Sequence, residues 1–235
     1  MTLVAVRLRF LAVLITVVLP LTGASPVRAD IIAQWAFGGA TGELSMPKDL
    51  SLPGFLDGRS GPGWEATTVD PNATAANAFL SDSIPPAAED YIEFTDPPHT
   101  DDDGNNIPCL FFSPGGNCNT ADQALQRDKY FQISVRANAG FVLNLSSLTF
   151  KASRGGASTP RGYVVLSDVD GYTNIVDTQE IMAQRPDFAK FTIDLSGATY
   201  QGLSTVSFRI FVYIPAPSAG KSIDFNDVTI NGAVQ

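Results

Sequence analysis

Two cysteines are the residues of this chain whose type and spacing most directly suggest chemistry. Cys109 and Cys118 are the only cysteines among 235 residues, and eight residues separate them. In an oxidising compartment a pair this close forms a disulfide that closes the intervening loop, with a stabilisation of roughly 2 to 3 kcal/mol. A two-cysteine metal site is the alternative, and His99 is the one further ligand of that kind nearby. The spacing favours a disulfide.

A run of aspartates gives the densest group of carboxylates. Asp101 and Asp103 lie just before Gly104, and calcium loops place oxygen ligands around such a turn. With Gly104 at the turn, however, the first ligand position falls on His99 and the last on Leu110. Because neither residue supplies a carboxylate, the pattern favours a solvated acidic loop over a high-affinity calcium site.

The sequence offers little for catalysis. His99 is the single histidine, and no G-x-S-x-G motif is present to place a serine nucleophile beside it. A pair of carboxylates for glycoside hydrolysis depends on a separation in space that sequence does not reveal. The residues favour a non-catalytic protein, with a secreted glycan hydrolase as an alternative.

The elements that would position these residues are strands. Residues 130–137 alternate Phe131, Ile133 and Val135 with polar side chains, a period of two that is typical of a strand with one buried face. Similar patterns predict strands at 141–152, 162–168, 188–195, 206–214 and 221–230. The chain is therefore predicted to be all-β, an antiparallel two-sheet sandwich that is jelly-roll-like. One short helix is expected at 120–129, with Thr120 as its N-cap.

The segment before residue 130 divides into a strand and a long irregular zone. Residues 30–37 are predicted to form an opening strand, with core candidates Ile31, Ile32, Trp35 and Phe37. Residues 38–128 are rich in Gly, Pro, Asn and Asp, with brief strands expected at 64–69, 78–80 and 91–94. Since the opening strand needs a partner, residues 30–235 are interpreted as one domain in which it pairs with the C-terminal half. Residues 38–128 are then a loop-rich insertion.

Residues 1–29 have the features of a secretory signal peptide. Arg7 and Arg9 precede an apolar run over 10–21, and small residues end at Ala29. The run is shorter than the ~20 residues that a spanning helix needs. We expect cleavage before Asp30, no membrane span afterwards, and a protein that is secreted or held at the cell surface.

The charge of the chain restricts its partners. The whole sequence carries 15 basic and 24 acidic residues, a net charge of −9. Removal of residues 1–29 takes away three arginines and no acid, which leaves 12 basic residues against 24 acidic ones, or −12. A surface of this sign repels phosphate, so nucleic acid is excluded as an expected partner.

Several segments resemble a domain of secreted bacterial proteins that are sorted by exosortases through a PEP-CTERM tail. They are YFQISVRANAGFVLNLSSLTFKASRGG, GYVVLSDVDGY, VSFRIFVY and SIDFNDVTING, with AQWAF at the opening strand. The resemblance implies a secreted β-sandwich and says almost nothing about activity. The chain ends at Gln235 without the Val-Pro-Glu-Pro motif of the tail, which favours release over anchoring.

Carbohydrate-binding modules of jelly-roll fold suggest a second calcium position. By analogy with them, Glu43 and Asp224 are candidate ligands between the N-terminal region and the last strand. Asp227 lies three residues after Asp224 and faces the opposite side of a regular strand. Asp224 and Asp227 would therefore share an ion only if a bulge lay between them.

Aromatic residues near turns are the candidates for ligand binding. Sugar rings stack on exposed tryptophan and tyrosine faces, and the candidates of this kind are Trp64, Tyr163 and Tyr172. The sequence favours an adhesion or structural protein of the cell surface or extracellular matrix. The alternative is a carbohydrate-binding module that recognises extracellular polysaccharide through these rings.

Overall fold

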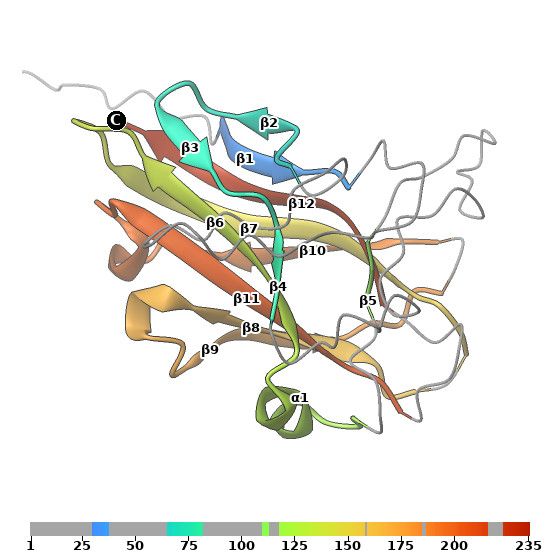
Figure 1. Ribbon diagram of the computed structural model, residues 1–235. Helices are drawn as coiled ribbons and strands as arrows, with labels where there is room; N and C mark the ends of the chain where they lie inside the picture. The colour runs from blue at the N-terminus through green and yellow to red at the C-terminus, as the bar shows by residue number, and fades with distance from the viewer. Residues whose placement is uncertain are drawn as a thin grey trace, which may run out of the picture.

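Two six-stranded antiparallel sheets make up the computed structural model, which describes residues 30–37, 65–81, 110–112, 118–157, 159–184, 187–215 and 223–235. Sheet A has the order β10 (Ala189–Asp194), β7 (Leu143–Arg154), β12 (Ile223–Val234), β1 (Asp30–Trp35), β2 (Thr68–Val69), with β5 (Leu110–Phe112) also paired to β12. Sheet B has the order β3 (Ala73–Ala75), β6 (Tyr130–Ala137), β11 (Thr205–Tyr213), β8 (Gly162–Ser167), β9 (Ile175–Glu180), with β4 (Phe79–Leu80) also paired to β6. Figure 1 shows the two layers. The predicted fold class, an antiparallel jelly-roll-like sandwich, is confirmed.

The core lies between the two sheets and is filled by alternate side chains of their strands. Phe131 and Ile133 of β6 and Phe208 and Ile210 of β11 are each 0% exposed, as the period of two predicted. Phe150 of β7 contributes from sheet A, and other aromatic rings pack closely around it. Since the inner faces of both sheets contribute to one cluster, the sandwich has a single continuous core.

The N-terminal strand pairs with the C-terminal strand. Residues of β1 from Asp30 to Trp35 lie antiparallel to β12, opposite Gly232 to Val228, which confirms the predicted pairing of the opening strand with the C-terminal half. Ile32, Trp35 and Phe37 are buried as expected. Ile31 is 39% exposed, so its assignment to the core is wrong. The reason is an extra residue in β1, since the register to β12 shifts between Ile31 and Ala33.

A two-turn helix covers part of the outer face of sheet B. Helix α1 (Ala121–Arg127) begins after Thr120, whose side chain accepts a hydrogen bond from the backbone N–H of Gln123, as the sequence predicted. It lies against β8 and β11 (Figure 1). Beneath it is a second apolar cluster of Cys118, Ala124, Tyr130, Val164, Leu166, Phe211 and Tyr213. Among the described residues, no helix is long and apolar enough to cross a bilayer.

Candidate functional site

A β-bulge interrupts β12 in the middle of sheet A. Asn226 pairs with Lys151 of β7 and Thr229 pairs with Thr149, so β12 advances three residues while β7 advances two. Asp227 lies within this bulge, and its φ of 51° is in the left-handed region, which aspartate tolerates better than most side chains do. Bulges of this kind redirect side chains and are frequent beside binding sites.

The bulge changes which side chains of β12 share a face. Phe225 and Val228 are three residues apart, yet both are 0% exposed within the core. Asp224 and Asp227 consequently both belong to the outer face of sheet A, where a regular strand would have separated them. The sequence required a bulge between Asp224 and Asp227 if the two were to share a face, and the structure contains one.

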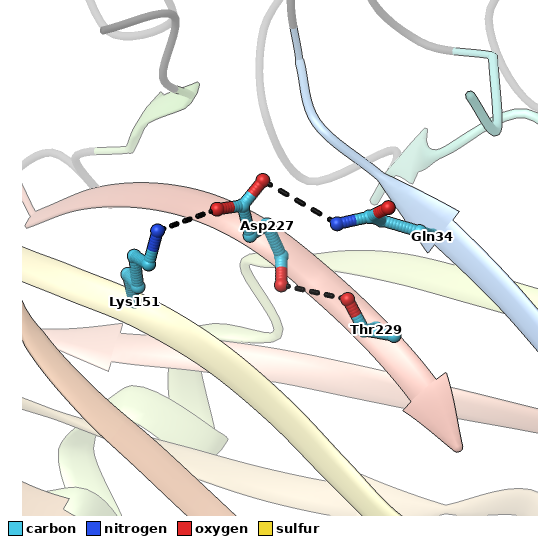
Figure 2. A network of polar contacts seen from close by, with 4 residues as sticks. All are labelled: Gln34, Lys151, Asp227 and Thr229. Carbon is cyan, nitrogen blue, oxygen red and sulfur yellow. Dashed lines mark hydrogen bonds and ion pairs between the residues drawn. The ribbon is translucent and has the colours of Figure 1, made fainter. Parts of the chain in front are cut away.

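Side chains from β1 and β7 fix the Asp227 carboxylate, as Figure 2 shows. The Lys151 ammonium lies 2.8 Å from one carboxylate oxygen, and the Gln34 amide donates to the other at 3.4 Å. The Thr229 hydroxyl donates to the Asp227 backbone carbonyl at 3.0 Å. The side chains of Lys151 and Asp227 are 50% and 33% exposed, so water and other ligands reach this ion pair.

These residues line a groove on the outer face of sheet A, with a volume of about 240 Å³. We name it the sheet A groove, and its lining consists of Ile31, Gln34, Thr149, Phe150, Lys151, Lys190, Asp227, Thr229 and Asn231. The Asn231 amide donates to the hydroxyls of Ser147 and Thr149 at 3.2 and 3.3 Å. The groove therefore offers ammonium, carboxylate, amide and hydroxyl groups, which is a set suited to hydrogen-bonding a polar ligand.

Tyr172 lies on the other side of the molecule, on the outer face of sheet B. Its ring is half-buried because the Arg209 guanidinium lies 3.7 Å from its centroid. The same guanidinium lies 4.4 Å from the centroid of the Tyr130 ring, and Arg209 Nε donates to Gln132 Oε1 at 3.1 Å. We name these four residues the Arg209 clamp. Burial, followed by the charge of Asp168, raises the pKa of Tyr172, while Arg209 opposes the increase.

Tyr163 lies in the core, so its expected exposure is wrong. Its side chain is 0% exposed, and its ring packs edge-on against Phe150 and Phe191 at centroid distances of 4.9 and 5.1 Å. The hydroxyl donates to Asp177 at 2.6 Å. Burial, with a further contribution from this hydrogen bond, raises the pKa of Tyr163. The ring is therefore not available as a surface platform for sugar.

Most of the other predicted site residues lie outside the part of the chain that the structure describes, namely Glu43, Trp64, Asp101, Asp103 and Cys109. Cys118 is buried, its Sγ lies 3.7 Å from the Val212 carbonyl oxygen, and burial raises the pKa of its thiol. Because Cys109 is not described, the disulfide stays a prediction. Asp224 is 0% exposed. The described residues include no group of three metal-binding side chains, and calcium binding also stays a prediction.

Sequence reasoning missed the residues that the structure brings together in both places. Asp227 was considered only as a partner for Asp224, and the residues around it come from strands far apart in the chain. The signal for the bulge was present, since Phe225 and Val228 break the period of two. Arg209 carried no sequence signal, because its position between two tyrosine rings depends on the pairing of β6 with β11.

Comparison with known proteins gives distant structural likenesses only. No protein-family model and no curated protein matches the sequence. Among solved structures, the K3 cleaved adhesin domain of Lys-gingipain from Porphyromonas gingivalis is 14% identical, with 55% of this chain and 77% of that chain covered and a TM-score of 0.35.

Two carbohydrate-binding modules are similarly distant. A family 35 module from an environmental isolate is 11% identical, with 61% of this chain and 87% of that one covered and a TM-score of 0.35. A mutant family 29 module complexed with mannohexaose is also 11% identical, with 87% and 93% covered and a TM-score of 0.33.

Proposed function

We propose that this protein is a non-catalytic binding protein for extracellular polysaccharide and that the sheet A groove is its binding surface. The observation that carries the proposal is the bulge at Asp227, which sets a carboxylate between Lys151 and Gln34 on the outer face of sheet A. A residue in the left-handed region costs conformational energy, and such residues are frequent at binding sites.

The chemistry of the groove matches that of a neutral sugar chain. Each sugar hydroxyl both donates and accepts hydrogen bonds, and the groove presents acceptors on Asp227 and donors on Lys151 and Lys190. Hydrogen bonds to charged groups are stronger than those between neutral groups. Exposed Ile31 adds a small apolar surface at the same place, against which the C–H face of a sugar packs.

The lining of the groove argues against hydrolysis of the bound chain. Glycoside hydrolysis uses two carboxyl groups placed on either side of the scissile bond. Among the residues that line the sheet A groove, Asp227 alone carries a carboxylate, and an ammonium group already neutralises it. Binding without cleavage is the function that this geometry supports, and it gives the adhesion or matrix role expected from the sequence a physical basis.

Native gel electrophoresis through immobilised polysaccharide tests the proposal. We expect gels that contain galactomannan, xylan or mixed-linkage β-glucan to retard the wild-type protein in at least one case. Asp227→Asn keeps the backbone conformation but removes the charge-assisted hydrogen bond, and we expect about tenfold weaker binding.

The matched control is Asp187→Asn. It removes the same charge from an exposed residue outside the groove and should bind as the wild type does. If none of the polysaccharides retards the wild-type protein, the proposed function is refuted. Equal retardation of wild type and Asp227→Asn would refute the assignment of the groove.

A further inference from the structure

The Arg209 clamp has the features of a second binding site on the face opposite the sheet A groove. Arg209 and Gln132 are directly paired across β11 and β6. The guanidinium lies over the rings of both Tyr130 and Tyr172, and the Tyr172 hydroxyl donates to the same Gln132 oxygen that Arg209 Nε contacts, at 3.3 Å. The orientation of the guanidinium plane is therefore fixed before any ligand arrives.

The terminal nitrogens of Arg209 are available to a ligand. Within the described part of the chain, Arg209 Nε donates to Gln132 Oε1 and the Arg209 side chain also hydrogen-bonds to the Tyr172 hydroxyl, but no ion pair to a carboxylate is found. The Arg209 side chain is partly exposed, and the atoms at its end are the terminal nitrogens Nη1 and Nη2. Together they form a planar pair of donors that matches the two oxygens of a carboxylate.

The positive charge of the clamp lacks an ion-pair partner among the described residues. Asp168, in the turn that follows β8, interacts with this charge and accepts a hydrogen bond from the Ser207 backbone N–H at 2.8 Å. Burial raises the pKa of Asp168, while Ser207 and then Arg209 lower it. Asp168 therefore interacts with Arg209 through space, and none of the described residues forms an ion pair with the guanidinium.

The backbone around Tyr172 is held in an unusual conformation. Gly171 and Tyr172 have φ of 72° and 60°, and a tyrosine in this region is rare. The Tyr172 N–H donates to the Ser167 carbonyl at 2.8 Å, which closes the turn. This turn places the ring over Arg209, and a left-handed tyrosine maintained by its surroundings is the kind of strain that accompanies binding sites.

From this geometry we propose that the Arg209 clamp binds the carboxylate of an acidic sugar, with Nη1 and Nη2 of Arg209 donating to its two oxygens. The hydroxyl of Ser207 lies beside the clamp on the same face of β11, and it bonds to Ser134 at 2.9 Å. Hydroxyl and amide groups surround the guanidinium on this side, which favours a hydroxylated acid over an apolar one. The site shares no residue with the sheet A groove and does not depend on the function proposed for it.

A titration with D-galacturonate and D-galactose tests the proposal, because these sugars differ only in the group at the sixth carbon. Followed by NMR chemical shifts of the wild-type protein, galacturonate should bind at least about tenfold more tightly than galactose, as expected for a bidentate arginine contact. Propionate supplies a carboxylate without the sugar hydroxyls and should bind more weakly than galacturonate. Equal binding of galactose and galacturonate, or of propionate and galacturonate, would overturn the proposal without requiring any variant.

Variants then locate the site. Arg209→Lys keeps the charge but loses the planar pair of donors, and we expect galacturonate binding to fall about tenfold. Arg136→Gln changes an exposed arginine of β6 on the same face and should leave it unchanged. Asp227→Asn should also leave it unchanged, which separates failure of this site from failure of the groove. If Arg209→Lys binds galacturonate as tightly as the wild type and has the same thermal melting curve, the Arg209 clamp is not the binding site.

Discussion

Substitution of Asp227 separates the stability of the bulge from its role in binding. An ordinary residue in the left-handed region costs about 1 to 2 kcal/mol, whereas glycine adopts it freely but loses roughly 0.5 to 1 kcal/mol of conformational entropy on folding. The ion pair with Lys151 is half-exposed and contributes about 1 kcal/mol or less. The free energy of unfolding of Asp227→Gly should therefore lie within about 1 kcal/mol of the wild-type value. That of Asp227→Ala should lie roughly 0.5 to 1 kcal/mol below that of Asp227→Gly, because the left-handed cost exceeds the entropy that alanine saves.

Urea unfolding followed by tryptophan fluorescence measures these differences in the free energy of unfolding. Both variants lack the carboxylate, so both should lose retention by polysaccharide although only Asp227→Ala is destabilised. If Asp227→Ala proves as stable as Asp227→Gly, the left-handed backbone at the bulge is not strained. If Asp227→Gly retains full polysaccharide binding, the bulge does not serve to present a carboxylate.

Two further substitutions test the positions given to Tyr163 and Asp168. Tyr163→Phe removes a hydrogen bond to Asp177 and should lower the free energy of unfolding by about 1 to 2 kcal/mol with no effect on polysaccharide retention; loss of retention at full stability would instead support a surface role. Burial raises the pKa of Asp168 in the folded protein, so the folded state favours the protonated carboxyl. The stability that this proton contributes is present at low pH and is lost as the pH rises through the raised pKa. Asp168→Asn, which keeps an oxygen for the Ser207 N–H, should therefore gain stability relative to the wild type between acidic and neutral pH, and urea unfolding that shows the opposite trend would contradict this assignment.

The strands were predictable where one face of the sheet is polar. In β6, Phe131, Ile133 and Val135 alternate with polar residues, and all three are in the core. The polar positions were less predictable, since Gln132 and Ser134 are only 2% and 3% exposed. They are buried because side chains of neighbouring strands lie over them, which is a consequence of strand order and cannot be read from one strand.

Tyr163 shows where alternation fails. In β8, Tyr163 and Val165 fill the core, while Val164 and Leu166 pack in the second apolar cluster beneath α1. A strand that is buried on both faces carries no period of two, so its sequence does not tell which side faces the core. The sequence therefore did not reveal that Tyr163 is buried.

The pairing of β1 with β12 also determines when the chain is able to fold. β12 lies between β7 on one side and β1 and β5 on the other, so sheet A cannot be assembled before residues 223–234 have been synthesised. Contacts between segments this far apart in sequence also slow folding. Such a delay leaves the inner face of sheet B, whose last strand ends at Tyr213, without its covering layer until β12 emerges.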